Sequence, residues 1–543
     1  MSKFLSLLCL LPGIKSFCQD YTVPGKISVP YPTLINLGVE WNIKGDDNQN
    51  GVVTVKYRKK GTAKWLDAMN LRRVPAGKNN TASSLGDRQI PGYTGYEWTN
   101  KHAGSIFDLE PGTSYEILLS MNDPDGGSVV KRTKGKTRQI PLPQRKSRLI
   151  EIAPGDYDTL HTVSGSKYRP VVYRCKSGRA VFKFIDVRNR KWVFIQKLEV
   201  RNLATDGIAV SLDGSENCAV TGCVINAVYG IVAYKPGATN CYFSDNVLNG
   251  VCSWNNISMG AMGDNVGEGI QVTGPGNVIC YNRVSGFRDC ISFMEDEYVV
   301  NQTCIDVYNN DILNALDDAV EADFSFSNCR VMRNRITNAY VGLSSQPGLG
   351  GPTYFIRNVM YNVIHAAFKL KRFSIGDVVL HNTVVKIGTG LGGNSKMDHA
   401  WFRNNLAVGG PSGDINWGGY GAGIPAAANV IEPGEHSSFD YDAIGVYASG
   451  YSASIGGQPF SEVEKNGVEH LEFNQTFRDV DFPYPPVPGR SIPDLRLKPG
   501  SKAIDAGMYI PNVNSDFSGK APDCGAYESE QELPHYGPRN RTN

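Results

Sequence analysis

The sequence predicts an all-β protein in which an N-terminal β-sandwich is followed by a right-handed parallel β-helix. Three observations lead to this fold class. A short motif recurs with a spacing near 24 residues through the middle of the chain, apolar and polar residues alternate before it, and 59 of the 543 residues are glycine. Frequent glycine and asparagine are typical of turn-dense β architectures. A chain of this length also exceeds one ordinary compact domain.

The repeated motif is an apolar residue, an asparagine three residues later and a second apolar residue two positions further on. Its central residues are Cys223 (in place of asparagine), Asn246, Asn282, Asn310, Asn334, Asn358, Asn382 and Asn405. Successive positions are separated by 23, 36, 28, 24, 24, 24 and 23 residues. A repeat of this length is typical of one coil of a parallel β-helix. We therefore expect the asparagine side chains to stack at one corner and to satisfy backbone groups there.

The repeat and the composition divide the chain into five segments. We expect a signal peptide over 1–18, a β-sandwich over 20–138, a stiff linker over 139–149, the β-helix over 150–430 and an irregular C-terminal cap over 431–543. The interval of 36 residues holds about twelve surplus residues, at roughly 254–266. Surplus residues in a solenoid project as loops, often on the binding face. Trp254 in this loop would be able to stack on a sugar ring or to anchor the loop.

The first residues have the pattern of a secretory signal, with Lys3, an apolar run over 4–11, and the small residues Ser16 and Cys18 before Gln19. We therefore expect a secreted or periplasmic protein. No other run approaches the ~18 apolar residues of a membrane span. The net charge of +2 gives no argument for nucleic acid. We expect a monomer that binds a polysaccharide or oligosaccharide, without an organic cofactor because no phosphate-binding loop is present.

Twelve cysteines occur, and ten of them follow the predicted signal peptide. An oxidising compartment would permit disulfides. Most of these cysteines nevertheless lie within the repeats, which favours small buried side chains. Their spacing matches no zinc motif.

The first domain carries a recognisable turn motif. Residues 39–43 and 53–57 alternate as strands do. The sequence LEPGTSY at 109–115 resembles the L-x-P-G-T-x-Y segment of fibronectin type III domains, in which the tyrosine makes a corner hydrogen bond. The resemblance implies a spacer or supporting module without chemistry of its own.

Aligning the coils on the asparagine brings charged residues into columns. The residues at odd distances after the asparagines are Asp289, Asp317 and His365 at seven, Glu321 and Lys369 at eleven, and Glu295, Asp323 and Lys371 at thirteen. The even positions are apolar or small: Met294, Val320, Ala322, Phe368 and Leu370. Because side chains alternate along a strand, we expect the odd set on the outer face. Stacked carboxylates repel, which raises a pKa and marks a candidate functional site. A solvated acidic face and a calcium site are the alternatives.

Paired carboxylates are the groups that glycoside hydrolysis requires. We assign acid/base roles to Asp289, Asp317 and Asp318, with Glu321 supporting. Substrate-binding roles are assigned to Glu295, His365, Lys369, Lys371 and Arg372. Whether Asp317 or Asp318 faces the cleft depends on a one-residue register that the sequence leaves open.

This arrangement resembles the polygalacturonase family of β-helix hydrolases (glycoside hydrolase family 28). Asp289, in the sequence GFRD, corresponds to that family's first aspartate and Asp317-Asp318 to its Asp-Asp pair. His365 takes the place of the family's histidine, and Lys369 or Lys371 that of its substrate-binding basic residue. The next coil has the sequence VGL at 341–343 where the family has Gly-His-Gly, and no Arg-x-Lys motif follows. The resemblance implies a shared architecture and hydrolysis of a polysaccharide.

Two other functions stay open. One is β-elimination from a uronic-acid polymer, with Lys369, Lys371 or Arg372 as the base and Glu295, Asp317 or Asp323 holding calcium. The other is a non-catalytic glycan-binding or adhesive β-helix, in which outward carboxylates would be scattered over several faces. Here they concentrate on the coils after Asn282 and Asn310, beside the surplus loop, which favours an enzyme.

Overall fold

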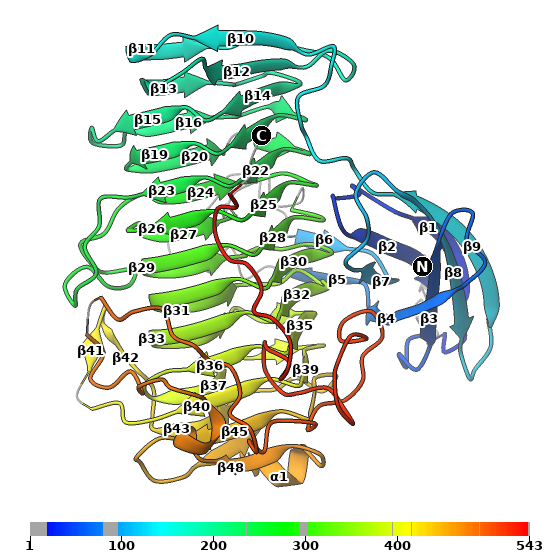
Figure 1. Cartoon of the computed structure of the whole chain (residues 1–543). Coiled ribbons are helices and arrows are strands. Elements are labelled where there is room, and N and C mark those ends of the chain that lie inside the picture. Colours follow the sequence, from blue (N-terminus) through cyan, green and yellow to red (C-terminus); the bar gives the residue numbers. More distant parts are fainter. Residues whose placement is uncertain are drawn as a thin grey trace, which may run out of the picture.

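The computed structural model describes residues 19–79, 96–234, 236–293, 302–393, 395–413, 415–487 and 489–540. The predicted signal peptide and Glu295 therefore lie outside the described residues. A small antiparallel β domain lies beside a long parallel β-helix, and the C-terminal segment runs back along the β-helix (Figure 1). Within the described ranges, no helix has the length and apolar character that crossing a membrane requires.

The N-terminal domain is one antiparallel sheet folded over a single core. Its strands are β1 (Val23–Ser28), β2 (Leu37–Lys44), β3 (Val52–Lys59), β4 (Leu66–Val74), β7 (Lys101–Ile106), β8 (Ser114–Asn122) and β9 (Val129–Lys136), beside a hairpin of β5 (Gly77–Asn79) and β6 (Tyr96–Trp98). The order is β1-β2-β7-β4-β3-β8-β9. Strand β4 pairs with β3 through its first half and with β7 through its last three residues, so it joins two layers. Trp41, Val55 and Ile117 are buried between these layers.

The predicted tyrosine corner is present in this domain. The hydroxyl of Tyr115 accepts a hydrogen bond from the backbone N–H of Glu110 at 2.9 Å. This bond fixes the turn between β7 and β8, because Tyr115 is itself buried in the core. Membership of the fibronectin type III family stays a prediction.

The β-helix consists of two long parallel sheets. The first has twelve strands: β10 (Arg148–Ile152), β12 (Val171–Cys175), β14 (Val193–Gln196), β18 (Ala219–Thr221), β22 (Tyr242–Ser244), β25 (Val278–Cys280), β28 (Asp306–Tyr308), β30 (Cys329–Met332), β32 (Thr353–Ile356), β35 (Asp377–Leu380), β39 (Trp401–Arg403) and β44 (Ser438–Asp440). The second has seventeen: β11 (Gly155–His161), β13 (Ala180–Asp186), β15 (Glu199–Asn202), β16 (Ile208–Ser211), β19 (Val224–Ala227), β20 (Tyr229–Ala233), β23 (Val247–Asn249), β24 (Glu268–Val272), β26 (Arg283–Ser285), β27 (Asp289–Ser292), β29 (Asp311–Glu321), β31 (Arg335–Ser345), β33 (Val359–Leu370), β36 (Thr383–Val385), β40 (Leu406–Gly409), β45 (Ala443–Val446) and β48 (Val468–Leu471).

Shorter elements complete the coils. They are β17 (Ser215–Glu216), β21 (Ala238–Thr239), β34 (Ser374–Ile375), β37 (Thr389–Gly393), β38 (Met397–Asp398), β41 (Asn416–Trp417), β42 (Tyr420–Gly421), β43 (Ala426–Val430), β46 (Ala453–Ile455), β47 (Gln458–Pro459), α1 (Phe460–Val463) and α2 (Phe473–Thr476). The predicted fold class, a β-sandwich followed by a parallel β-helix, is confirmed.

The asparagines of the repeat form the predicted ladder at one corner. The side-chain amide of Asn358 donates to Oδ1 of Asn382, one coil further on, at 3.0 Å. The same Oδ1 accepts the backbone N–H of Asn358, also at 3.0 Å, and the amide of Asn358 donates in addition to the carbonyl of Val331. The pattern repeats from Asn246 to Asn405. Each buried asparagine thus satisfies backbone groups that the turn would otherwise leave unpaired.

The predicted alternation is also confirmed where the structure describes it. Val320, Ala322, Phe368 and Leu370 are buried in the core of the β-helix.

Eight of the ten cysteines are buried and the other two half-buried, and none of these ten forms a disulfide. They fill the core as small side chains.

The coils extend past residue 430, where the sequence period ends. Strands β44, β45 and β48 add to the two sheets. Asp442 takes the ladder position 37 residues after Asn405, and its Oδ1 accepts from the amide of Asn405 at 2.8 Å. The backbone N–H of Asp442 then donates to Glu464, which ends the ladder. A change from asparagine to aspartate after a long interval conceals this coil in the sequence.

The C-terminal segment is only in part the expected cap. Phe460 of α1 closes the end of the core. Residues beyond α2 instead run back along the outside of the coils (red in Figure 1), and Arg539 forms an ion pair with Asp245 at 2.7 Å. The segment therefore lies across coils that are far apart in the sequence and connects them through its contacts.

The N-terminal domain is fixed to the β-helix by buried polar contacts. Arg330 and Asp306 form an ion pair with both side chains fully buried. Arg330 also donates to Ser105 at 3.0 Å, and Asn36 donates to Asp306 at 2.8 Å. Because each of these groups would be costly to leave unpaired, the contacts hold the domain in one place.

Candidate active site

The predicted acidic residues lie on neighbouring strands of the seventeen-stranded sheet. Glu268 of β24 stands opposite Asp289 of β27, and Ile291 of β27 opposite Val320 of β29. This register places Asp289 beside Asp318, whose backbone N–H donates to Asp289 Oδ1 at 2.7 Å. One column of carboxylates therefore runs across three successive coils.

The sequence leaves open whether Asp317 or Asp318 faces away from the core, and a β-bulge lets both do so. The register between β29 and β31 shifts between Ala315 and Asp318. The extra residue of a bulge re-aims neighbouring side chains, and here both aspartates contact groups outside the core. Asp318 forms an ion pair with Lys369, and Asp317 lies 3.7 Å from Arg288. Counting seven residues from Asn282 and Asn310 aligns Asp289 with Asp317. In the structure the bulge shifts the register by one residue, so Asp318 lies beside Asp289 instead.

Two cations hold the carboxylates. The ammonium group of Lys369 lies against Asp318, and both side chains are nearly buried. Arg288 lies 3.6 Å from Asp289 as well as 3.7 Å from Asp317, so it bridges two coils. At the start of the column, the hydroxyl of Ser292 donates to Glu268 at 2.6 Å. Carboxylates outnumber cations here, so the carboxylates repel one another.

Burial and mutual repulsion raise the pKa values in this cluster. The pKa of Asp289 rises to about 6, through burial first and the charge of Asp318 second. The pKa of Asp317 lies well above its ordinary value because of burial and of the charges of Asp318 and Asp289. Burial likewise raises the pKa values of Glu321 and Glu268. The cluster thus combines carboxyl groups whose pKa values are raised with cations that hold neighbouring carboxylates.

Burial alone would lower the pKa of Lys369, but the surrounding carboxylates outweigh it, led by Asp318. The pKa of this ammonium group therefore lies well above its ordinary value. Lys369 stays charged at neutral pH.

His365 forms the next part of the site, on β33. Its Nδ1 lies 2.9 Å from the carbonyl oxygen of Gly421, an acceptor, so Nδ1 carries the hydrogen. Nε2 is buried and has no partner. Burial lowers the pKa of His365 to about 4, so the ring is neutral at pH 7. The ring stacks on Tyr340 at 5.4 Å and faces Tyr420 at the same centroid distance.

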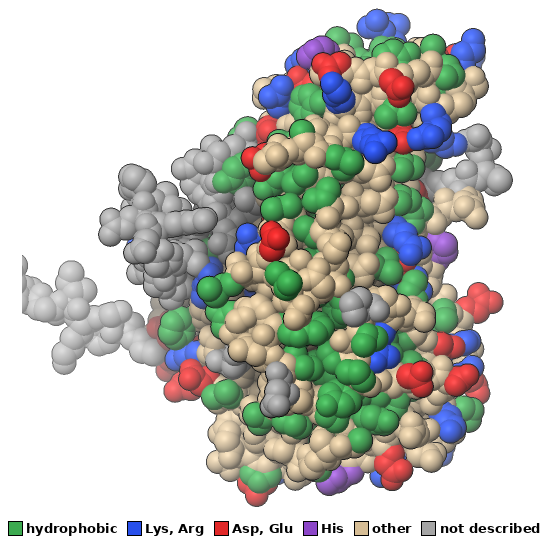
Figure 2. All heavy atoms as spheres, turned by 90° about the vertical axis from the view of Figure 1, so that its left-hand side faces the viewer, with side chains coloured by type: hydrophobic (Ala, Val, Ile, Leu, Met, Phe, Trp, Pro, Cys, Tyr) green, Lys and Arg blue, Asp and Glu red, His purple; other side chains and the backbone are tan. Residues whose placement is uncertain are grey.

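These groups border a cleft of about 530 Å³. It is lined by Ala261, Asp317, Tyr340, Val341, Gln346, His365, Lys369, Lys371, Arg372, Phe373, Ser395 and Tyr420. Asp289 and Asp318 are buried, and neither is among these lining residues. Figure 2 views this side of the β-helix, where uncharged surface predominates over the middle coils.

Two loops build the wall of the cleft. The surplus residues between β23 and β24 contribute Ala261, and the β41–β42 hairpin contributes Tyr420. The surplus loop and the hairpin pack closely at Gly418 (φ +61). A Cβ at this position would lie only 2.5 Å from the carbonyl oxygen of Met259, so the contact leaves no room for a side chain. The hydroxyl of Tyr340 also donates to the carbonyl of Trp417 at 3.1 Å.

Trp254 anchors the surplus loop and does not face a sugar. Its ring is 7% exposed and packs edge-to-face on Trp417, with centroids 5.8 Å apart. The alternative of a stacking platform at this position is therefore wrong.

The structure brings most of the predicted site residues together. Asp317, His365, Lys369, Lys371 and Arg372 line the cleft. Glu321 is half-buried in the column of Ser292, Ser344 and Lys369. Glu295 lies outside the described residues. Asp323, expected on the solvent side, is fully buried and accepts from Ser344 and from the backbone of Gln346, because the following turn folds over it.

Four further residues belong to the site although the asparagine alignment does not select them: Glu268, Arg288, Tyr340 and Tyr420. Glu268 carries a usable signal. Glu268, Asp289 and Asp318 each precede a β-branched residue by two positions: Ile270, Ile291 and Val320. Counting back two positions from this β-branched residue, instead of forward from the asparagine, aligns all three acids.

The raised pKa of Asp289 predicts that ionisation of this carboxyl lowers the free energy of unfolding in a pH-dependent way. Because the folded-state pKa of about 6 exceeds the ordinary 3.8, protonation favours the folded chain. This contribution is complete below pH 3.8 and is lost as pH rises through about 6. Asparagine imitates the protonated carboxyl, so Asp289→Asn should gain roughly 3 kcal/mol of stability relative to wild type between about pH 4 and about pH 7.

Denaturant unfolding of both proteins at several pH values measures this difference. Asp264→Asn, an exposed position in the surplus loop, is the control and should show no such pH dependence. A constant difference between Asp289→Asn and wild type across this range would contradict the raised pKa.

Comparison with known proteins gives only distant likenesses. No protein-family model matches the chain, and no curated protein matches it. A family 28 exopolygalacturonase from Yersinia enterocolitica is 10% identical and covers 83% of this chain and 99% of its own, with a TM-score of 0.32. The catalytic domain of a family 87 α-1,3-glucanase is similar at 11% identity in complex with tetrasaccharides (84% and 96% covered, TM-score 0.24). It is similar at 10% in complex with nigerose (83% and 96% covered, TM-score 0.23). TM-scores this low leave the function to be argued from the site itself.

Proposed function

We propose that the protein hydrolyses glycosidic bonds of a polysaccharide in this cleft. The observation that supports the proposal is Asp317, a carboxyl with a raised pKa that lines the cleft beside cation-held carboxylates. Environments that push the pKa values of neighbouring carboxyls apart supply an acid and a base at one pH. A purely adhesive surface gives no reason to concentrate costly buried carboxylates at one place.

In this proposal Asp317 is the general acid. It donates its proton to the glycosidic oxygen while the bond from that oxygen to the anomeric carbon breaks. Asp289 is ionised at neutral pH but lies behind the lining of the cleft, so in this proposal it accepts, through one intervening water molecule, a proton from the water whose oxygen bonds to the anomeric carbon. Arg288 positions both carboxyl groups, since it lies within 3.7 Å of each. Lys369 positions Asp318, whose backbone N–H in turn orients Asp289.

The basic residues of the cleft favour a substrate with acidic sugars. Lys371 lies 5.8 Å from the ring centre of Tyr420, and Arg372 follows it in the lining. Their charges would complement a uronate carboxylate, while the aromatic wall of Tyr420 would contact a sugar ring. We therefore propose a polysaccharide or oligosaccharide that contains uronic acid.

Elimination is the second candidate, because two groups in the cleft suit a base. Burial and the charge of Lys369 lower the pKa of Lys371, and the neutral ring of His365 has an unpartnered Nε2, which is buried and would have to become exposed to reach a substrate. Lys369 does not suit this role, since it stays protonated. Within the described residues, which exclude Glu295, no group of three or more His, Cys, Asp or Glu side chains is arranged to hold a metal ion such as calcium.

The proposal includes a location and a module type. The signal peptide predicted over 1–18 would place the enzyme outside the cytoplasm, secreted or periplasmic. The tyrosine corner at Tyr115 supports a fibronectin-like supporting role for the first domain.

Digestion of uronate-containing and neutral polysaccharides by the full chain tests the proposal. Reducing ends and the ultraviolet absorbance of unsaturated uronate are followed together, with and without chelator. We expect reducing ends from a uronate-containing polymer without absorbance, unaffected by chelator, and still formed by Lys371→Ala. Absorbance that Lys371→Ala abolishes would overturn hydrolysis in favour of elimination.

A further inference from the structure

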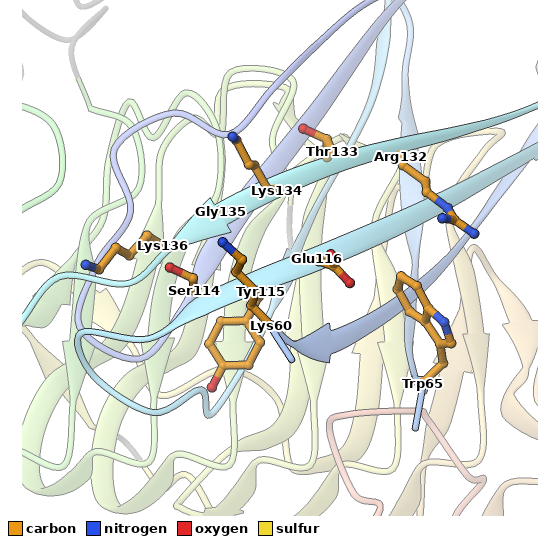
Figure 3. A pocket seen from close by; sticks show the side chains of 10 residues that line it. All are labelled: Lys60, Trp65, Ser114, Tyr115, Glu116, Arg132, Thr133, Lys134, Gly135 and Lys136. Atoms are coloured by element: carbon orange, nitrogen blue, oxygen red, sulfur yellow. The ribbon is translucent and has the colours of Figure 1, made fainter. Parts of the chain in front are cut away.

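The N-terminal domain carries a second groove, far from the cleft along the chain. Its volume is about 770 Å³. The lining residues are Lys60, Trp65, Ser114, Tyr115, Glu116, Arg132, Thr133, Lys134, Gly135 and Lys136 (Figure 3). They come from strands β8 and β9 and from the turn after β3.

Strand register places the basic residues of β9 in a row. Ser114 pairs with Lys136, Glu116 with Lys134 and Leu118 with Arg132. Because side chains alternate along a strand, Arg132, Lys134 and Lys136 share one face. Alternate residues repeat at about 7 Å along a strand. Arg132 lies near Trp65 at one end of the groove and Lys136 near Ser114 at the other (Figure 3).

This row is exposed and its charge is not neutralised. Lys60, Arg132, Lys134 and Lys136 are exposed, and none of them forms an ion pair within the part of the chain that the structure describes. Glu116 is the single carboxylate among the lining residues, and it already accepts from Arg58 Nε at 2.6 Å. Exposed like charges side by side repel one another, so the arrangement suits an anionic ligand.

We propose that this groove binds an anionic polysaccharide chain as a site separate from the cleft. The row of three cations matches an extended polymer, and Trp65, over whose ring Arg58 lies 4.5 Å from the centroid, adds aromatic surface at its end. Glu116 keeps lone pairs that accept sugar hydroxyl groups, which an acidic glycan offers on every unit and the backbone of duplex DNA does not. The observations therefore favour a hydroxyl-rich acidic glycan over nucleic acid.

The choice of polysaccharide rests in part on the proposed function, because Lys371 and Arg372 would bind the same class of polymer in the cleft. A polymer held at both places would be presented to the cleft at a raised effective concentration.

Affinity electrophoresis of the full chain in gels that contain polygalacturonate tests the groove. Asp317→Asn serves as background so that the polymer is not cut. The triple variant R132A/K134A/K136A should bind polygalacturonate roughly tenfold more weakly, with a shallower dependence on salt. The matched control K465A/K502A/K520A removes the same charge from exposed lysines elsewhere and should bind like the background protein. Trp65→Ala should weaken the binding that remains at high salt.

Gels with neutral pullulan and titration with duplex DNA complete the experiment. We expect no retardation by pullulan and weaker binding of DNA than of polygalacturonate at equal salt. Equal polygalacturonate binding by the two triple variants would overturn the proposal that this groove binds the polymer. Tighter binding of DNA than of polygalacturonate would overturn the choice of a glycan as its ligand. Failure of the proposed function shows elsewhere, as absence of cleavage products from wild type, and leaves the retardation result intact. Coincident unfolding curves of the variants exclude misfolding as the cause.

Discussion

Asp317→Asn is expected to lower the rate of polysaccharide cleavage by about 10²–10⁴-fold and to leave the fold intact. The amide keeps the size of the carboxyl but has no proton to donate to the leaving oxygen. Because burial and the charges of Asp318 and Asp289 raise the pKa of Asp317 well above its ordinary value, the site disfavours the ionised form and the neutral amide should cost little stability. Initial rates of reducing-end release from the best polymer substrate measure the effect.

A substrate that needs no protonation separates this role from a general defect. An aryl glycoside with a good leaving group should be cleaved by Asp317→Asn at a rate close to that of wild type. Asp264→Asn, exposed in the surplus loop, should retain full activity on both substrates. An equal loss on polymer and aryl glycoside would show that Asp317 is not the acid.

Lys369→Met is expected to destabilise the protein by roughly 3–5 kcal/mol and to abolish activity. The methionine fills the space of the lysine stem but leaves Asp318 buried without its cation. Repulsion between the carboxylate of Asp318 and its acidic neighbours then rises, since Lys369 offsets the charge of Asp318 most strongly. Denaturant unfolding at neutral pH measures the loss.

The double variant K369M/D318N is the control for this prediction. It removes the uncompensated charge together with the cation, so most of the stability should return while activity does not. Destabilisation of the double variant as large as that of Lys369→Met would show that packing of the lysine stem, and not its charge, carries the effect.

The coils and their corner could be predicted because the asparagine ladder imposes a fixed sequence requirement. Asn310, Asn334, Asn358 and Asn382 each occupy a buried turn where one side chain satisfies the backbone of its neighbour. Few residues meet that demand, so the motif recurs at nearly constant spacing. The coil after Asn405 could not be predicted from the motif, because Asp442 performs the same task with a carboxylate.

The candidate site was only partly predictable, for reasons of local geometry. The bulge before Asp318 shifts the register by one residue, and counting from Asn310 does not detect that shift. The surplus loop hides Glu268 from the same count. Tyr420 reaches the cleft from a hairpin outside the repeated strands. The groove of the first domain was not predicted, although Arg132, Lys134 and Lys136 alternate along one strand.

Digestion in heavy-oxygen water, with mass spectrometry of the products, tests the central claim most directly. Hydrolysis adds one water across each broken bond, so each new reducing end should carry a labelled oxygen while the other new end gains only a proton, and Asp317→Asn should form few labelled ends. Products without added water, bearing an unsaturated uronate in place of the label, would contradict hydrolysis by the Asp289, Asp317 and Asp318 cluster.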